Sequence, residues 1–584
     1  MLKNKKIYFF KKKRVDDSTN EKFQFFLFAR SYVLMMSILF FSIAYNQFTN
    51  FVLCGVLFLT IFEILNIKRD KIWVRYPLLL VVAVILGIFS FETIVILAPE
   101  STALQTSTDS ARYLISALIQ GEAAIIAIVI TLSLVAIQQT SSSYSARVID
   151  IFKDPRKTPD FFILIISYII CIVFGALLLK IIKDQSQVDQ VVSTSIDTWI
   201  WVSFILFIFL LISLIPYILH TLEMFKPSTL IRLLSENINK EAIESAIELE
   251  KSNSQDKSGQ IILINDTIQP IVDVLQGSIK SYDYETTRYG LKIIENKTIQ
   301  IIDAKYDLTN KEAISNRMID YVKIIGIIAA KQEMERTVND AVYTLLRISN
   351  SLIENKIYAP ISSLILALLK IGEQTINEKL ENSTIDVLKT LNEIGIKSID
   401  IGINKITQNV LSSIIRITLE KIAIESSPSV YQSLYSVVCL NAIQSLRNIG
   451  KKIAAKGEWE FEINILIVGF KEISEMLMDN TETQRNWKHL VTALLYSLYL
   501  ISHELMINNY LSLIFDITSE IHSIGVKSFN KNKDVTKFSL SLLNRLEEEN
   551  IKFNLQDTSE LNDFKLSIHI RRLRDNMSTL LDGI

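Results

Sequence analysis

Residues 360–402 read PISSLILALLKIGEQTINEKLENSTIDVLKTLNEIGIKSIDIG, and their pattern predicts the architecture of the C-terminal half. It contains one phrase twice: Ile-Gly, ending at Gly372 and at Gly395, with a Leu four residues before each glycine. Apolar residues recur every three or four positions, which is typical of amphipathic helices. One helix with a short turn takes about 20–25 residues, so each phrase marks one helix.

The phrase recurs along the chain at a nearly constant interval. Its small residue advances in steps of 23 residues and then at somewhat longer intervals, at Gly326, Ser349, Gly372, Gly395, Thr418, Gly450, Ser474, Ser502 and Gly525. We expect a solenoid of similar helices, with the small residue near the middle of each helix, where it permits a close crossing. Chance repetition in a sequence rich in Ile and Leu is the alternative.

The length, composition and motifs of the chain exclude several classes of protein. The 584 residues are too many for one soluble domain, and 49% of them are hydrophobic. A formal net charge of −1 gives no basic field for nucleic acid. The three cysteines and five histidines show no spacing typical of disulfide frameworks or metal sites. No phosphate-binding loop, catalytic serine motif or dinucleotide fingerprint occurs, so we expect no cofactor and no enzyme activity.

Six apolar segments near the N-terminus are long enough to span a bilayer, which requires about 20 residues. They are residues 23–45, 51–67, 77–97, 116–138, 161–182 and 199–220. The predicted fold is all-α: a six-helix transmembrane domain followed by a cytoplasmic helical repeat domain. The expected divisions are a basic tail (1–22), the transmembrane domain (23–220), an amphipathic connector and loop (221–260), the repeat domain (261–530) and a C-terminal helical cap (531–584).

Basic residues in the loops predict the orientation of these segments. Lys and Arg are concentrated in the N-terminal tail, in residues 68–75 and in residues 147–157. The intervening loops at 99–112 and 184–197 carry one basic residue and none. Because basic loops stay in the cytoplasm, we expect a multi-pass protein of the cell membrane with both termini cytoplasmic.

Several charged residues lie within the apolar segments, where a charge is costly. They are Arg30, Glu63, Glu92, Glu122 and Lys180. One interpretation is an ion or proton pathway. The other is structural, with ion pairs or side chains that reach the headgroups. Arg30 and Glu63 lie at similar depth in neighbouring segments, and we expect them to pair.

The fourth segment has a face of polar and small residues. Gln120, Ala124, Ala127, Thr131 and Gln138 recur on one side of the predicted helix. Small residues let membrane helices approach closely, and hydroxyls can bond across such a contact. The same face could instead line a narrow wet pore.

A short polar motif follows the fourth segment. It consists of Ser141, Ser142, Tyr144, Ser145 and Arg147. With the preceding helix, it resembles a family of predicted prokaryotic membrane proteins of unknown function, in which a membrane helix runs into Ser-Ser-x-aromatic-Ser-Pro-Arg. Ala146 stands at the proline position. The resemblance covers about residues 116–234 and implies a membrane protein, without implying catalytic residues.

Two functions from different classes are consistent with this organisation. The first is a non-enzymatic membrane protein whose cytoplasmic helical array binds a protein partner or senses a state. The alternative is an oligomeric ion channel or transporter, with the fourth membrane helix lining the path and the array gating it. In both cases the expected partners are the lipid bilayer and further copies of the chain. A membrane enzyme is a third possibility, and no motif supports it.

Overall fold

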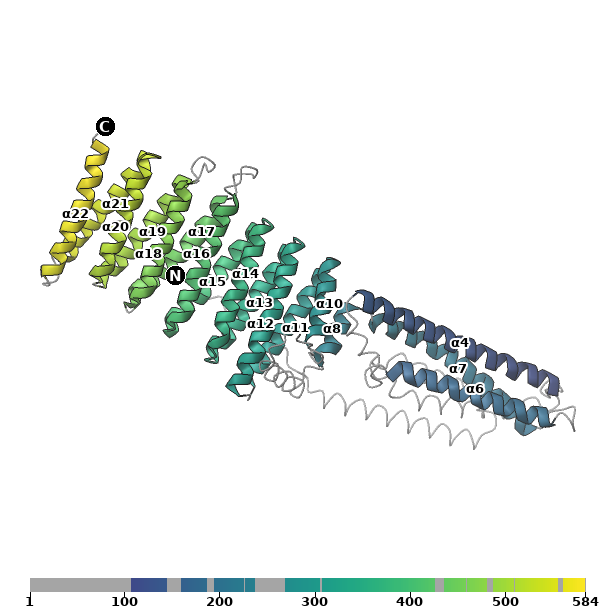
Figure 1. The fold of residues 1–584 in the computed structure, drawn as a ribbon. Helices are drawn as coiled ribbons and strands as arrows, with labels where there is room; N and C mark the ends of the chain where they lie inside the picture. Colours follow the sequence, from purple (N-terminus) through teal and green to yellow (C-terminus); the bar gives the residue numbers. More distant parts are fainter. Residues whose placement is uncertain are drawn as a thin grey trace, which may run out of the picture. The chain divides into compact units, whose positions relative to one another are not determined.

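A computed structural model shows a chain of helices (Figure 1). It describes residues 107–143, 159–185, 194–224, 226–236, 268–304, 307–425, 435–457, 459–479, 487–508, 510–554 and 560–582. Within these ranges there are helices and turns and no β-strands, which confirms the all-α prediction. The chain divides into two compact units: Met1–Thr140 with Ile149–Phe225, and Ser141–Val148 with Lys226–Ile584.

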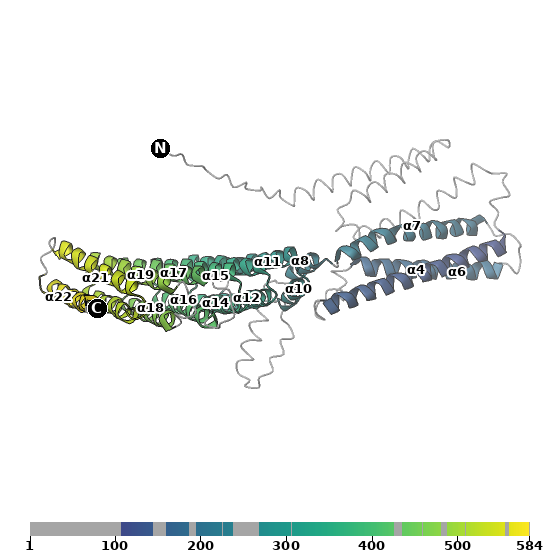
Figure 2. The ribbon, with the colours of Figure 1, turned by 90° about the horizontal axis from the view of Figure 1, so that it is seen from above.

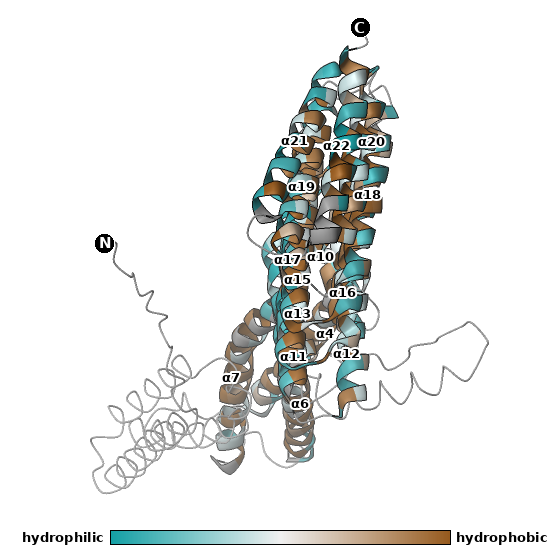
Figure 3. Cartoon of the chain, turned by 90° about the vertical axis from the view of Figure 1, so that its left-hand side faces the viewer, coloured by the Kyte–Doolittle hydropathy of each residue, from teal (hydrophilic) through white to brown (hydrophobic). Residues whose placement is uncertain are grey.

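The described part of the first unit consists of three long apolar helices, α4 (Thr108–Ser143), α6 (Pro159–Gln185) and α7 (Thr194–Met224). They contain the fourth, fifth and sixth predicted membrane segments. Each is longer than the roughly 20 residues needed to span a bilayer. Figure 3 shows α6 and α7 as hydrophobic along most of their length. The first three predicted segments, with Arg30, Glu63 and Glu92, lie outside the described residues.

Five described helices are long and apolar enough to cross a membrane by length and composition. Besides α4, α6 and α7, these are α14 (Ala359–Asn377) and α19 (Trp487–Ile507). In α14 and α19, 61% of the most apolar 18-residue stretch of the helix is buried, whereas 22–35% of the corresponding stretch is buried in α4, α6 and α7. Packing against neighbouring protein helices therefore accounts for the apolar residues of α14 and α19.

The second unit is an array of helices in two layers. Figure 2 shows α11, α15, α17, α19 and α21 in one row and α12, α14, α16, α18 and α22 in the other. The remaining bounds are α8 (Pro227–Glu236), α10 (Gln269–Lys280), α11 (Tyr284–Asp303), α12 (Leu308–Lys331), α13 (Glu335–Glu354), α15 (Glu381–Ile401), α16 (Asn404–Glu425), α17 (Tyr435–Lys456), α18 (Glu460–Asp479), α20 (Leu511–Ser528), α21 (Lys533–Asn554) and α22 (Glu560–Asp582).

Helices from α11 to α22 contact both the next helix and the next but one. We call the layer of α11, α13, α15, α17, α19 and α21 the odd layer, and the layer of α10, α12, α14, α16, α18, α20 and α22 the even layer. The structural repeat is therefore a pair of helices, although the sequence repeat is a single helix. Helix α8 packs against α10 and α11, so the amphipathic stretch after the membrane unit begins the array.

The small residue of the repeat lies in the last turns of each helix, and its predicted place near the middle is wrong. Gly372 is five residues before the end of α14, and Gly395 is six before the end of α15. The reason is the turn that follows, in which the residue seven positions later adopts a positive φ. These residues are Glu333, Lys356, Lys379 and Gly402, with φ of 56°, 59°, 60° and 78°.

The left-handed residue closes each helix with a backbone hydrogen bond. After Lys379, the Leu380 N–H donates to the Thr375 carbonyl at 2.8 Å, and the buried Leu380 side chain covers the helix end. The same bond runs from Ile403 to Ser398 after Gly402. This is the pattern expected of a helix C-cap, where glycine is the preferred residue. The array thus uses lysine twice at positions that favour glycine.

These turns give a prediction about stability. We expect Lys379→Gly to raise the free energy of unfolding by about 0.5–1 kcal/mol, because a non-glycine residue with positive φ is strained. Gly402→Lys should lower it by a similar amount, since the position has no neighbouring atom within 4 Å to clash with a new side chain. Chemical denaturation followed by circular dichroism measures both. A loss of stability in Lys379→Gly would contradict the expectation.

The repeated motif, an Ile followed by a small residue, makes a packing contact between helices. The Ile side chain of one helix lies against the small residue of the helix two positions earlier in the same layer. A Cβ added to Gly372 would lie 2.9 Å from Ile417 Cδ1, and one added to Gly395 would lie 2.9 Å from Ile449 Cδ1. Gly326 receives Ile371 and Gly450 receives Ile501 in the same way. A copy of the motif therefore takes part in two contacts, through its Ile with the preceding helix of the layer and through its small residue with the following one.

Candidate functional site

A small cavity lies among the three described membrane helices. It is lined by one acidic, one hydroxyl and one thiol side chain among apolar groups: Ile115, Leu118, Ile119, Glu122, Cys171, Phe174, Gly175, Ser203 and Leu206. Its volume of about 10 Å³ is close to the space that one water molecule requires. The polar residues come from all three helices, α4, α6 and α7.

Two glycines bring the helices together beside this cavity. A Cβ added to Gly175 of α6 would lie 2.9 Å from Ile119 of α4, and one added to Gly121 would lie 3.2 Å from the Phe207 ring of α7. Small residues permit such close approach between membrane helices. The close packing explains why Glu122, the neighbour of Gly121, is only 4% exposed.

The Glu122 carboxyl has no hydrogen bond or ion pair with any described residue. Buried carboxyl groups ordinarily have such partners, because an unpaired charge in apolar surroundings costs several kcal/mol. Glu122 therefore differs from Glu295 of the array, which is similarly buried and accepts a hydrogen bond from Arg347 at 3.1 Å.

Ser203 is also unusual among the buried serines of the membrane unit. The hydroxyls of Ser133, Ser167 and Ser213 each donate to a backbone carbonyl in the preceding turn at 2.7 Å. Ser203 is 8% exposed, and its hydroxyl has no hydrogen-bond partner among the described residues. It lies on α7, facing the cavity that Glu122 also lines.

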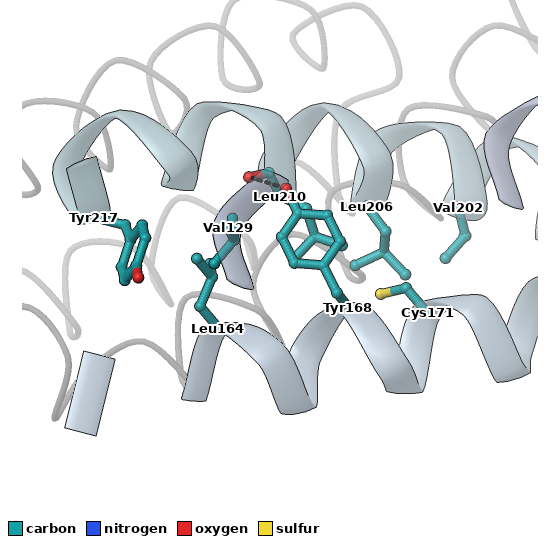
Figure 4. Close-up of a cluster of buried hydrophobic side chains, with 8 residues drawn as sticks. All are labelled: Val129, Leu164, Tyr168, Cys171, Val202, Leu206, Leu210 and Tyr217. Atoms are coloured by element: carbon teal, nitrogen blue, oxygen red, sulfur yellow. Dashed lines mark hydrogen bonds between the residues drawn. The ribbon is translucent and has the colours of Figure 1, made fainter. Parts of the chain in front are cut away.

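An apolar cluster adjoins the cavity (Figure 4). In this cluster the Tyr168 hydroxyl donates to the Leu210 carbonyl at 3.0 Å, and Ser133 is hydrogen-bonded to Tyr217. Cys171 and Leu206 belong to both the cluster and the cavity lining. The two tyrosine hydroxyls of the cluster thus have hydrogen-bond partners within the protein, in contrast to Glu122 and Ser203.

The structure separates the polar residues predicted for the fourth membrane segment. Glu122 is buried, whereas Gln120, Thr131 and Gln138 are exposed on α4. The Thr131 hydroxyl donates to the Ala127 carbonyl of its own helix, and Gln120 donates to Ser116. Lys180 is exposed on α6. The polar face of α4 therefore points away from α6 and α7 and does not line the cavity.

The motif after the fourth segment lies at the edge of the described residues. Ser142 is exposed in the last turn of α4. The side chain of Ser141 is not described, and Tyr144, Ser145 and Arg147 lie outside the described residues. Sequence reasoning missed Ser203, since a serine in an apolar segment carries no pattern that distinguishes it from its hydrogen-bonded neighbours.

The array offers a second candidate site, a row of exposed side chains on its odd layer. The position six residues before the small residue is exposed in α13, α15, α17 and α19. We call these residues, Tyr343, Lys389, Gln444 and Tyr496, the odd row. The matching positions of the even layer are also exposed and form the even row: Asp320, Leu366, Ser412, Val468 and Ser519.

The two rows differ in chemistry. The odd row carries tyrosines, an amide and a cation, and the even row carries an acid, two serines and two aliphatic residues. Tyr496 is also held in place, because its ring stacks on Tyr499 at 5.9 Å and the Tyr499 hydroxyl donates to Glu549 at 2.7 Å. Tyrosines are enriched in protein interfaces, and the odd row carries two of them.

Ion pairs connect neighbouring helices of each layer. In the odd layer Arg347 pairs with Glu295 at 3.1 Å and Lys452 with Asp400 at 2.6 Å. In the even layer Lys527 pairs with Glu475. The pairs of Lys452 and Lys527 are partly exposed and contribute little stability individually, whereas Glu295 is buried. Each of these three pairs links a helix to the next helix of its own layer.

Residues 69–285 match the family described as "Predicted membrane protein (DUF2254)". The match confirms the resemblance to predicted membrane proteins of unknown function and reaches from before α4 into the first turn of α11. No curated protein matches the chain. Among solved structures, a "Circular tandem repeat protein with novel repeat topology and enhanced subunit contact surfaces" is similar at 12% identity and a TM-score of 0.33, over 81% of this chain and 97% of that chain. That likeness is too distant to support an inference. The family match and the apolar helices together show a membrane protein.

Proposed function

We propose that the chain is a non-enzymatic, multi-pass membrane protein whose helical array is a docking platform for a protein partner. The odd row carries this proposal, since it places two tyrosines, a lysine and a glutamine at equivalent exposed positions of four successive odd-layer helices. Interfaces favour tyrosines because each buries a large area with little loss of side-chain freedom. The contacts between repeats hold the row in a fixed register.

Site-specific photo-cross-linking in intact cells tests this proposal. A photoreactive amino acid replaces Tyr343, Lys389 or Tyr496 in the odd row, and Ser412 or Ser519 in the even row serves as the matched control. We expect one discrete cross-linked product from the odd row and little from the even row. Equal labelling from both rows, or none from the odd row, would show that this face is not the docking surface.

The second candidate function, an oligomeric channel or transporter, rests on a different observation. Gln120, Thr131 and Gln138 are exposed on α4, where polar side chains would be costly against lipid. A second copy of α4 could satisfy them. Single cysteines at these three positions should then form disulfides between copies in the membrane, and ion flux should accompany them. Cross-linking without flux would indicate an oligomer and exclude the channel.

We also propose that both termini are cytoplasmic, from the basic bias of the loops. The prediction uses a background in which Cys54, Cys171 and Cys439 are replaced by Ser. A single cysteine placed at Gln105 or at Gln187 should react with a membrane-impermeant thiol reagent added outside the cell. Protection of both positions, with labelling of a cysteine at Ser143, would give the opposite orientation.

A further inference from the structure

We propose that Glu122 and Ser203 hold one water molecule between them inside the membrane unit, and that the Glu122 carboxyl carries an exchangeable proton there. This site is independent of the docking function of the array. It rests on three features: a cavity of about 10 Å³, a buried carboxyl, and a buried hydroxyl, where neither polar group has a hydrogen-bond partner among the described residues.

The carboxyl is more stable here in its neutral form. The described residues that line the cavity contain no cation, and most of the lining is apolar. A carboxylate in such surroundings costs several kcal/mol more than a neutral acid, because none of the described residues that line the cavity supplies an opposite charge to replace its hydration. A neutral carboxyl supplies one O–H donor and a carbonyl acceptor, and both need partners.

The size and composition of the cavity select the ligand. A buried water needs about 10–15 Å³ and two or more polar partners, and Glu122 with Ser203 provides them. The Ser203 hydroxyl is free to bond the water because, unlike Ser167, it does not donate to a carbonyl of its own helix. Ca²⁺ or Mg²⁺ would need six or more oxygen ligands, and Zn²⁺ would need about four Cys, His or carboxylate ligands. Among the described residues no three His, Cys, Asp or Glu side chains gather as metal ligands.

Infrared difference spectroscopy of the full-length protein in lipid tests the proton. We expect the spectrum of the wild type minus that of Glu122→Gln to contain the carbonyl stretch of a protonated carboxyl at neutral pH. The band should shift in heavy water, because the proton exchanges. Absence of the band in a folded wild type would overturn the proposal, as would its loss on adding sodium chloride but not choline chloride, which would show a cation site.

Ser203→Ala tests the shared water. The carboxyl band should move toward the frequency of an acid without hydrogen bonds, since the water loses its second partner. Ser167→Ala is the matched control, because Ser167 is an equally buried serine whose hydroxyl donates to the Ile163 carbonyl. That variant should leave the band in place. An unmoved band in folded Ser203→Ala would overturn the water bridge, and this comparison does not depend on the folding of Glu122→Gln.

Discussion

Replacing Gly372 or Gly395 with Leu should destabilise the array by roughly 1–3 kcal/mol or more, since a larger residue overpacks a filled contact. A Cβ at Gly372 already lies 2.9 Å from Ile417 Cδ1 and 3.3 Å from Val387 Cγ1. A Leu side chain extends further into that space, where one neighbour belongs to the same layer and the other to the opposite layer. The helices must then move apart.

Alanine at the same positions separates overpacking from a general intolerance of substitution. Its Cβ meets the far end of a flexible Ile side chain, which can shift, and alanine stabilises a helix by up to about 1 kcal/mol relative to glycine. We therefore expect Gly372→Ala to change stability little. Ile417→Val removes the contacting Cδ1 atom and should reduce the cost of Gly372→Leu in the double variant.

Chemical denaturation of the full-length protein, followed by circular dichroism, measures these effects. Ser412→Leu is a suitable control, because Ser412 is exposed on α16 and has room for a larger side chain. If Leu is tolerated at Gly372 and Gly395 as well as at Ser412, close packing does not depend on these glycines. A fragment for the same purpose should begin at Lys226, because a later start would remove α8 from α10 and α11.

The repeat could be predicted from sequence because its period is visible in the chain itself. Steps of 23 residues between Ser349, Gly372 and Gly395 correspond to one helix and one turn. The alternation of layers could not be predicted in the same way. A small residue can pack against the next helix or the next but one, and only the structure shows that Ile417 rather than a residue of α15 makes the nearest contact to Gly372.

The place of the small residue within its helix could not be predicted, because it depends on the turn that ends the helix. Lys379 has no sequence feature that marks a left-handed conformation, whereas Gly402 at the equivalent position does. Alignment of the two repeats identifies the Lys379 turn, because the hydrogen bonds that follow both residues are equivalent. A search for glycine alone misses it and leaves the helix end undefined.

The candidate site was predictable only in part. Glu122 stands out as an acid in an apolar segment, but Gln120, two positions earlier, lies on a nearly opposite face of the helix. Which of the two faces is buried depends on how α6 and α7 pack against α4. Gly121 and Gly175 set that packing, and their partners Phe207 and Ile119 lie on other helices. A contact of this kind has no signature in a single sequence.

The buried ion pair between Lys421 and Glu381 should give the other large effect on stability. Lys421 of α16 is 2% exposed, and its Nζ atom lies 3.7 Å from Glu381 Oε1 at the start of α15. Glu381→Gln removes one opposite charge from the surroundings of a buried ammonium group. We expect a loss of at most about 3 kcal/mol, because the buried ammonium group loses one opposite charge and keeps its other contacts.

A double-mutant cycle isolates the pair. The variant carrying both Glu381→Gln and Lys421→Met should lose less stability than the two single variants added together, since it buries no charge. The exposed pair of Lys389 and Asp386, at 3.5 Å with 64% of the lysine side chain exposed, is the matched control. Its coupling should be below about 1 kcal/mol because water screens it. Denaturation midpoints of the four variants of each cycle decide the outcome. Additive losses at Lys421 and Glu381 would show that other contacts of Lys421, and not this carboxylate, hold its charge within the array.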